Sequence, residues 1–402
     1  MRKIKRRDFI YGAGLLSASF PLFRNILNNG SILRYNSNCD PWLEINLSNI
    51  EWNVNQLRKW VRNKPIMAVI KGNAYGHGLV KVGKFLEKIK IYALAVGKLQ
   101  EAIELRRNGV KCPVLNFGPF SEEDTELIIR SNISQTVYSD NVLALNKMAK
   151  KLNTQANVHI NIDTGLGRVG VPHYTALSFI ENVSKLDYIK IEGVFTVFTE
   201  EKNFDRIQLD RFLRICNDAK RKGISVGLRH VASSAGLLGF PESHLDMVRP
   251  GICIYGHYPS DEEYKLKKIE LKPALSLKTR VSYIKKLRPG DSISYHRKFV
   301  AKKEETVVTA SLGYSDGFPV NVIGKANAII KNEKFPLIAA VTANHISIKV
   351  TGKDNIKIGD EVVLIGSQGD CRISAEELAE ASDTSVYKVI IWLNPLLPRY
   401  YI

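Results

Sequence analysis

Cysteine is scarce in this chain of 402 residues, and its placement argues against two kinds of protein. No two cysteines form a C-x-x-C motif, and all five are widely spaced: Cys39, Cys112, Cys216, Cys253 and Cys371. A disulfide framework or a zinc site needs cysteines at close, regular spacing. The sequence therefore predicts neither a disulfide-rich scaffold nor a metal site. In an oxidising compartment one pair of these cysteines could still form a disulfide, and the sequence does not say which pair.

Long hydrophobic runs are also missing. A helix that crosses a bilayer needs roughly 18 or more mostly apolar residues in succession. The apolar stretch at residues 9–23 is shorter, is interrupted by glycine and proline, and follows a basic start, which is typical of a signal peptide. Arg6 and Arg7 directly before it resemble a twin-arginine export signal. We therefore expect residues 1–37 to export the protein, to the periplasm, with no other membrane segment; if the signal does not function, the protein is cytoplasmic.

Acidic residues are fewer than basic ones, 40 against 58, which gives a formal net charge of +18. Proteins that bind nucleic acid concentrate such charge on one face, often with aromatic side chains between the basic ones. No basic stripe with interleaved aromatics is found in this sequence. We interpret the charge as a solvated surface that favours acidic polymers, and we expect no nucleic-acid partner.

The length and the order of the apolar segments predict two domains. Over residues 40–273, short apolar strands alternate with helical patterns, as in repeated βα units. Eight strand candidates begin at Ile66, Ala93, Cys112, Gln135, Val158, Ile189, Val226 and Met247. Eight such units close into a TIM barrel, whose active site lies at the carboxyl ends of the strands.

Helices are expected between these strands, among them residues 79–88, 98–107 and 121–130. Ser121 should begin the third, with its hydroxyl capping free amides. From residue 274 to 402 the pattern changes to alternating strands, with turns at 289–291, 315–317 and 358–360 and one short helix near 375–381. This pattern predicts an α/β fold in which the barrel is followed by a mainly-β domain.

The most informative segment is residues 68–78, AVIKGNAYGHG, which places Lys71 at the end of a buried apolar strand. An amine held in such a place loses hydration, so its pKa falls and it can act as a nucleophile toward an aldehyde or as a base. A lone lysine at a strand end more often packs its stem and extends its ammonium into solvent. The chemical interpretation therefore needs support from the rest of the chain.

That support comes from a resemblance. The segment resembles the pyridoxal-phosphate (PLP) lysine motif of the alanine racemase family, and the likeness continues from about Asp40 to the end of the chain. The resemblance implies a PLP-dependent amino-acid racemase with the same order of barrel and β domain. It implies that Lys71 forms the Schiff base with PLP and acts as the base on one face of the substrate. Tyr75 would donate to the cofactor phosphate.

Further residues take cofactor roles by the same resemblance. Arg249, in DMVRPGICIYG, would meet the pyridine nitrogen; a guanidinium stays protonated and cannot readily give that nitrogen a proton. Arg168, in DTGLGRVG, would contact the phenolic oxygen of the cofactor and the substrate carboxylate, which suits its forked donors. The remaining candidate cofactor contacts are His230, Ser234, Gly251, Ile252 and Tyr387.

Racemisation also needs a second acid or base on the opposite face of the substrate. By resemblance this residue is Tyr295, in DSISYHRKF, which reaches across from the β domain of a partner subunit. A homodimer with Tyr295 acting in trans is therefore implied. Tyr314, in GYSDGF, would lie at the substrate entrance.

Departures from the family pattern affect the expected specificity. Val197 stands where the family usually has a histidine that links the tyrosine base to the arginine, and Asn161 where many members have a carbamylated lysine. Ala343 and Asn344 replace the usual methionine and aspartate beside the substrate. A smaller side chain and a neutral amide predict a substrate range wider than alanine.

Two alternatives stay open on the sequence alone. A PLP-dependent amino-acid decarboxylase shares the barrel-plus-β architecture and a PLP lysine, although Tyr295 and Arg249 stand in racemase-like contexts. A degenerate racemase that binds PLP without activity is the other alternative, because of Val197, Ala343 and Asn344.

Overall fold

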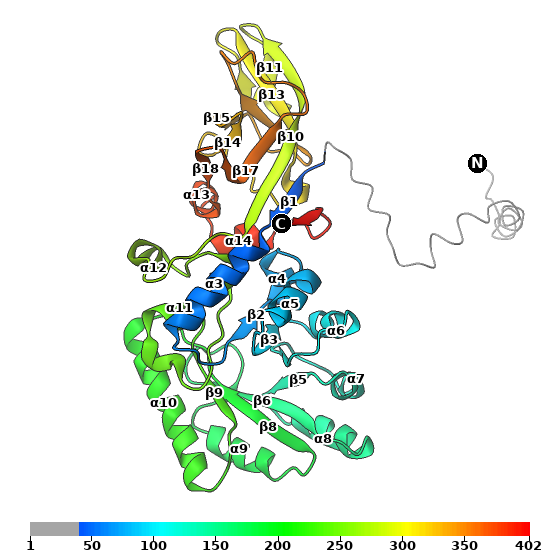
Figure 1. Cartoon of the computed structure of the whole chain (residues 1–402), viewed down its shortest axis with the longest axis vertical. Coiled ribbons are helices and arrows are strands. Elements are labelled where there is room, and N and C mark those ends of the chain that lie inside the picture. The colour runs from blue at the N-terminus through cyan, green and yellow to red at the C-terminus, as the bar shows by residue number, and fades with distance from the viewer. Residues whose placement is uncertain (1–39) are drawn as a thin grey trace, which may run out of the picture.

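The computed structural model describes residues 40–402 (Figure 1). The chain forms a barrel of parallel strands surrounded by helices, and a β domain stands on one end of it. The proposed signal segment, residues 1–37, and Cys39 lie outside the described residues. The four other cysteines are free thiols.

The barrel confirms the fold expected from the βα repeats. Its parallel strands follow one another around the sheet in chain order: β2 (Met67–Val69), β3 (Ala93–Val96), β4 (Val114–Asn116), β5 (Ser134–Val137), β6 (Ala156–Asp163), β8 (Ile189–Phe195) and β9 (Leu228–His230). The two-residue β7 (Val171–Pro172) pairs with β6. The eighth candidate, at Met247, forms only an isolated bridge between Ile66 and Val248. Backbone bonds from Met67 N to Val248 O, 2.9 Å, and from Arg249 N to Ala232 O, 2.8 Å, nevertheless close the ring.

Helices cover the outside of the barrel because their apolar faces pack on the strands. They are α3 (Leu47–Trp60), α5 (Leu79–Lys88), α6 (Leu99–Arg107), α7 (Thr125–Arg130), α8 (Val142–Lys151), α9 (Ala176–Ser184), α10 (Lys202–Arg221) and α11 (Ser234–Gly239). The short helix α12 (Asp261–Leu266) has no such apolar face, because its buried residue is Glu263. Short 3₁₀ turns follow at η1 (Pro241–His244) and η2 (Ile252–Tyr255).

Two helix starts differ from the prediction, and α6 begins only one residue late, at Leu99. The third predicted helix begins at Thr125 instead of Ser121. The Ser121 hydroxyl donates to Asp124 Oδ2 at 2.9 Å, and the Ser121 amide donates to the same oxygen at 2.8 Å. The carboxylate thus closes a turn before the helix, and the predicted capping by the Ser121 hydroxyl is wrong.

The β domain is built on one mostly antiparallel sheet. Its strands lie in the order β18 (Cys371–Ile373), β17 (Glu361–Gln368), β14 (Asn327–Ile330), β15 (Glu333–Ile338), β16 (His345–Lys349), β13 (Glu305–Ser311), β10 (Leu275–Leu287), β1 (Trp42–Ile45) and β19 (Arg399–Tyr401). A small hairpin of β11 (Ser292–Ile293) and β12 (Phe299–Val300) carries η3 (Tyr295–Arg297) in its loop, and η4 (Tyr314–Asp316) follows β13. Although residue 40 was expected to begin the barrel, β1 pairs with β10 and β19 in this second sheet.

Two helices of the β domain return to the barrel. The expected helix α13 (Ala375–Ala381) is followed by α14 (Val386–Ile391), which the sequence pattern did not predict. Helix α14 packs against α4 (Lys71–Tyr75), and a Cβ at Gly76 would lie only 2.1 Å from Ile390 O. The glycine therefore allows the two backbones to touch, and buried side chains of both parts form one continuous core.

Candidate active site

A cavity of about 370 Å³ opens at the carboxyl ends of the barrel strands. This is the end at which TIM barrels carry their active sites. The cavity brings together eight of the predicted site residues from distant parts of the chain: Lys71, Tyr75, Arg168, Ser234, Arg249, Gly251, Ile252 and Tyr387. Val197 and Asn161, the two departures on the barrel side, line it as well.

Lys71 is presented by a left-handed turn. The preceding strand β2 is buried, and residues 72–75 then adopt positive φ angles, 62° at Gly72, 57° at Asn73, 53° at Ala74 and 52° at Tyr75. A left-handed turn costs about 1–2 kcal/mol for each residue with a Cβ, so it persists only where its surroundings hold it. Here it places the side chains of Lys71 and Tyr75 on the same cavity.

Two residues that the sequence analysis did not single out hold this turn. Glu101 accepts hydrogen bonds from the amide of Asn73 at 3.0 Å and from the amide of Gly97 at 3.1 Å. The Nδ1 atom of buried His77 lies 2.9 Å from Tyr75 O and 3.1 Å from Ala74 O, so it is the protonated nitrogen that donates to these carbonyls. His77 belongs to the motif around Lys71, whereas nothing in the local sequence marked Glu101.

The surroundings of Lys71 favour its neutral amine. Burial lowers its pKa, the positive charge of Arg168 lowers it further, and the carboxylate of Glu101 acts in the opposite direction. The side chain still reaches the open space of the cavity. A partly desolvated amine with access to a ligand suits both attack on an aldehyde and proton transfer.

Hydroxyl and amide donors line another part of the cavity. Ser234 Oγ accepts the Gly251 amide at 3.0 Å, which leaves its own proton for a ligand. Burial raises the pKa of Tyr75 and of Tyr387, so both phenols keep their protons and can donate. As the first residue of η2, Ile252 has an amide with no acceptor inside that helix. Such a group of donors fits a phosphate.

Arg249 occupies the floor of the cavity and meets no carboxylate there. Its Nη2 donates to Thr196 O at 2.9 Å and to Val231 O at 3.2 Å, and its guanidinium lies 5.1 Å from the Phe195 ring centroid. Burial lowers its pKa to about 9, which keeps it protonated at neutral pH. His230 was expected to contact the cofactor but lies behind Arg249 instead, with its Nδ1 3.0 Å from Arg249 Nη1. It is not among the residues that line the cavity.

Arg168 reaches the cavity from a glycine-rich loop after β6. Asp163 Oδ1 accepts the amides of Gly165 and Gly167 at 2.9 and 3.0 Å, which folds the loop back on itself. Asn161 donates through Nδ2 to Val169 O at 3.1 Å. The amide thus fixes the loop beside Arg168 directly, at the position where a carbamylated lysine was expected in relatives.

These features fit PLP. A Cβ at Gly251 would lie 2.4 Å from the Tyr75 hydroxyl, so the glycine creates the cradle in which phenol, amide and Ser234 meet. Arg249 is placed for a ring nitrogen, Lys71 for a carbonyl carbon, and the donor group for a phosphate. Within residues 40–402 no group of His, Cys, Asp and Glu side chains could hold a metal ion.

The other predicted residues lie on the β domain, away from this cavity. Tyr295 is 80 % exposed on η3, next to β11 at the end of the β domain farthest from the barrel (Figure 1). Tyr314 is 57 % exposed, and its amide donates to Thr342 O at 3.0 Å beside Ala343 and Asn344. The chain therefore brings Tyr314, Ala343 and Asn344 together but places none of them, nor Tyr295, on its own Lys71 cavity.

Comparison with known proteins agrees with this geometry. The family profile "Alanine racemase, N-terminal domain" matches residues 45–259, and "Alanine racemase, C-terminal domain" matches residues 274–401. The alanine racemase of Clostridium tetani is 38% identical over 368 residues, which cover 90% of this chain and 95% of that protein.

Solved structures agree as well. The alanine racemase of Clostridium difficile 630 has a TM-score of 0.85 and 37% identity, covering 90% of this chain and 95% of that one. The Bacillus anthracis alanine racemase with bound L-Ala-P has a TM-score of 0.83 and 32% identity, with the same coverage.

A β/α barrel with a β domain, a reactive lysine, a buried arginine and a phosphate cradle together define a PLP-dependent enzyme. The chain belongs to the alanine racemase family. It is an isomerase of amino acids, and the family match favours this activity over the decarboxylase alternative. In the described part of the chain, no helix has the length and hydropathy to cross a membrane.

Proposed function

We propose that this protein interconverts L- and D-alanine with PLP held on Lys71, by two bases that come from two copies of the chain. One observation carries the proposal: Lys71 and a protonated Arg249 that has no carboxylate partner line the same cavity. PLP supplies electron withdrawal from the substrate Cα. A guanidinium at the ring nitrogen moderates that withdrawal, because it does not readily release its proton. This combination suits proton exchange at Cα better than more extensive chemistry.

The other residues of the cavity have separate tasks. Tyr75, Ser234, Tyr387 and the amide of Ile252 hold the phosphate, while the Gly251 amide donates to Ser234 Oγ and orients that hydroxyl. Arg168 binds the substrate carboxylate through its forked donors, and its charge adds to the effect of burial in lowering the pKa of Lys71. Lys71 then takes or returns a proton on one face of Cα.

The base for the opposite face comes from a partner subunit. Tyr295 lies at the distal end of its own chain's β domain, so it can act only on the cavity of another copy. A tyrosine works as a base when positive charge stands close to it, and Arg168 and Arg249 supply that charge in the partner's cavity. The functional unit proposed here is therefore a homodimer with two composite sites.

The β domain also supports a substrate range beyond alanine. Tyr314, Ala343 and Asn344 cluster on the same domain as Tyr295, and Asn344 Nδ2 donates to Ser315 Oγ at 2.9 Å. If Tyr295 enters the partner's cavity, this cluster accompanies it to the substrate entrance. The small Ala343 and the neutral Asn344 then leave room for longer side chains.

Mixing two inactive variants tests the composite site. Lys71→Ala removes the cofactor attachment and one base, and Tyr295→Phe removes the other base, so each homodimer should lose several orders of magnitude of activity. A one-to-one mixture, dissociated and reassembled, should recover about a quarter of parent activity, because half the dimers carry one intact site. No recovery from verified heterodimers would show that Tyr295 acts within its own chain or not at all.

We further propose that the basic and apolar start of the chain exports the folded holoenzyme. Export after folding would allow the protein to acquire a phosphorylated cofactor in the cytosol. Replacing Arg6 and Arg7 by lysines should leave the protein in the cytoplasm. Undiminished export of that variant would rule out the twin-arginine route.

A further inference from the structure

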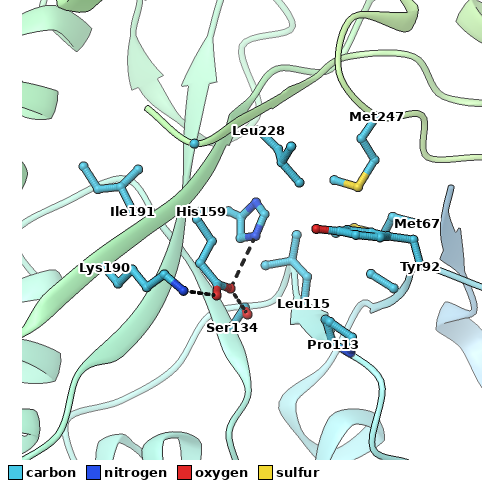
Figure 2. A pocket seen from close by; sticks show the side chains of 13 residues that line it. Met67, Tyr92, Pro113, Leu115, Ser134, His159, Lys190, Ile191, Leu228 and Met247 are labelled. Carbon is cyan, nitrogen blue, oxygen red and sulfur yellow. Dashed lines mark hydrogen bonds and ion pairs between the residues drawn. The ribbon is translucent and has the colours of Figure 1, made fainter. Parts of the chain in front are cut away.

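A second cavity, of about 310 Å³, opens at the opposite end of the barrel, where the strands begin (Figure 2). Apolar side chains form most of its wall: Met67, Pro113, Leu115, Ile191, Leu228 and Met247. Ser134, His159 and Lys190 lie together on one side (Figure 2), and Glu192 joins them into a polar cluster because its carboxylate faces all three. The reaction described above uses none of these four residues.

Buried hydrogen bonds connect this polar cluster to Arg249 through the interior of the barrel. His230 Nδ1 lies 3.0 Å from Arg249 Nη1, and His230 Nε2 lies 2.8 Å from His159 Nδ1. His159 Nε2 faces Glu192 Oε2 at 4.0 Å. The same Glu192 oxygen accepts the Ser134 hydroxyl at 2.6 Å. The two ends of the barrel are therefore linked by adjoining polar side chains.

The chemistry of arginine fixes the direction of these bonds. A guanidinium only donates, so His230 Nδ1 must accept and the neutral ring carries its proton on Nε2. The Nε2–H of His230 donates a hydrogen bond to His159 Nδ1. His159 therefore carries its own proton on Nε2, which faces Glu192. Burial lowers the pKa of His159 to about 3 and that of His230 well below its usual value, so both rings are neutral. Along the series Arg249, His230, His159 and Glu192, each N–H group is directed toward the next residue.

The local structure is shaped to accommodate the His159 ring. Gly193 lies opposite His159 on the neighbouring strand β8, and a Cβ there would lie 2.6 Å from His159 Nδ1. The glycine thus makes room for the imidazole between the strands. On the cavity side, Lys190 Nζ lies 3.3 Å from the other oxygen of Glu192. The carboxylate is therefore held between Ser134 and Lys190 while it faces His159.

We propose that His159 and Glu192 are positioning residues that hold His230 in the tautomer required by Arg249. With the other tautomer, an N–H group of His230 would face the guanidinium, and the arginine would lose a buried acceptor and shift in the cavity. Glu192 favours the required tautomer because its negative charge attracts the Nε2–H of His159. The inference rests on the proposed function only for the identity of the group that Arg249 meets.

The first test uses the protein without cofactor. With ¹⁵N-labelled histidine, both His159 and His230 should show an unprotonated Nδ1 and a protonated Nε2. Glu192→Gln should increase the Nδ1–H population of one or both rings. Lys190→Ala is the matched control, since it removes the other partner of the same carboxylate and should leave both tautomers unchanged. A protonated Nδ1 on either ring of the parent overturns the proposal.

The second test measures the consequence in the loaded enzyme. His159→Leu should change the visible absorption of bound PLP and lower kcat by roughly 2- to 30-fold, the usual range for coupling of this kind. His159→Asn should restore both, because the amide oxygen can accept the His230 Nε2–H. If His159→Asn folds normally but matches His159→Leu, or if no variant differs from the parent, the positioning role is wrong. Because the tautomers are measured without cofactor, failure of the racemase proposal would not affect that result.

Discussion

Gly251→Ala should weaken PLP binding by displacing Tyr75. The added Cβ would lie 2.4 Å from the Tyr75 hydroxyl oxygen and 3.0 Å from Cζ. Tyr75 cannot easily move away, because its ring is 4% exposed and lies 5.0 Å from the ring of Tyr255 and 6.1 Å from that of Tyr387. The φ angle of Gly251 is −115°, so alanine brings no left-handed strain. The collision is therefore the main effect of the substitution.

The magnitude follows from two costs. Forcing an extra methyl into a packed site typically costs about 1–3 kcal/mol. Losing one hydrogen bond to a charged group costs about 1.5–3 kcal/mol. If part of the collision is relieved by small shifts, we expect the Kd for PLP to rise by roughly 10- to 100-fold, at about 1.4 kcal/mol per tenfold change. Titration of the cofactor-free protein with PLP, followed by absorbance, measures this directly.

A double-mutant cycle separates the collision from other causes. Tyr75→Phe removes the oxygen nearest to the new methyl, so Gly251→Ala should weaken PLP binding less in that background than in the parent. The thermal midpoint of each cofactor-free variant shows whether the fold is intact. Equal losses of affinity in the two backgrounds, or parent-like binding by Gly251→Ala, would refute the reasoning.

Two further predictions concern stability and specificity. Burial lowers the pKa of His77 and His159 to about 3, whereas the pKa of unfolded histidine is about 6.5. As the pH falls from about 6.5 toward 3, only the unfolded state takes up protons at these two residues. The free energy of unfolding should therefore fall by about 1.4 kcal/mol per pH unit for each histidine. Urea midpoints that do not change between pH 7 and 5 would contradict this, and His77→Asn should reduce the slope. Ala343→Met should narrow the substrate range toward alanine, measured as kcat/KM over a panel of L-amino acids; a parent enzyme already confined to alanine would show the wide-range proposal to be wrong.

Local periodicity predicted where helices form more accurately than it predicted where they begin and end. The helix at residues 79–88 and the helix at 375–381 have the predicted bounds, because each is amphipathic or capped by nearby residues. The start at Ser121 was wrong because serine and Asp124 formed a turn with each other first. Strand β1 was missed as part of the second sheet because its partners, β10 and β19, lie more than two hundred residues away in the chain.

The site shows the same division between local and distant information. The resemblance of the motif around Lys71 to the family motif predicted roles for the lysine and for Tyr75, and both side chains line the cavity. Glu101 supports the motif through two backbone amides, a role that no local pattern marks. The placement of Tyr387 depends on the packing of α14 against α4. The position and tautomer of His230 depend on its hydrogen bond with Arg249. Such facts arise only when the strands are assembled.

The electrostatics of the cavity explain why Glu101 has two functions. Lys71, Arg168 and Arg249 bring three basic groups to one small space, and the positive charge of Arg168 lowers the pKa of Lys71. An anionic phosphate and a substrate carboxylate would balance this charge, which favours binding of both. Glu101 raises the pKa of Lys71 and also holds the left-handed turn through Asn73 and Gly97. The same carboxylate therefore partly offsets the repulsion between cations and fixes the backbone that presents the lysine, so its loss should affect charge and geometry together.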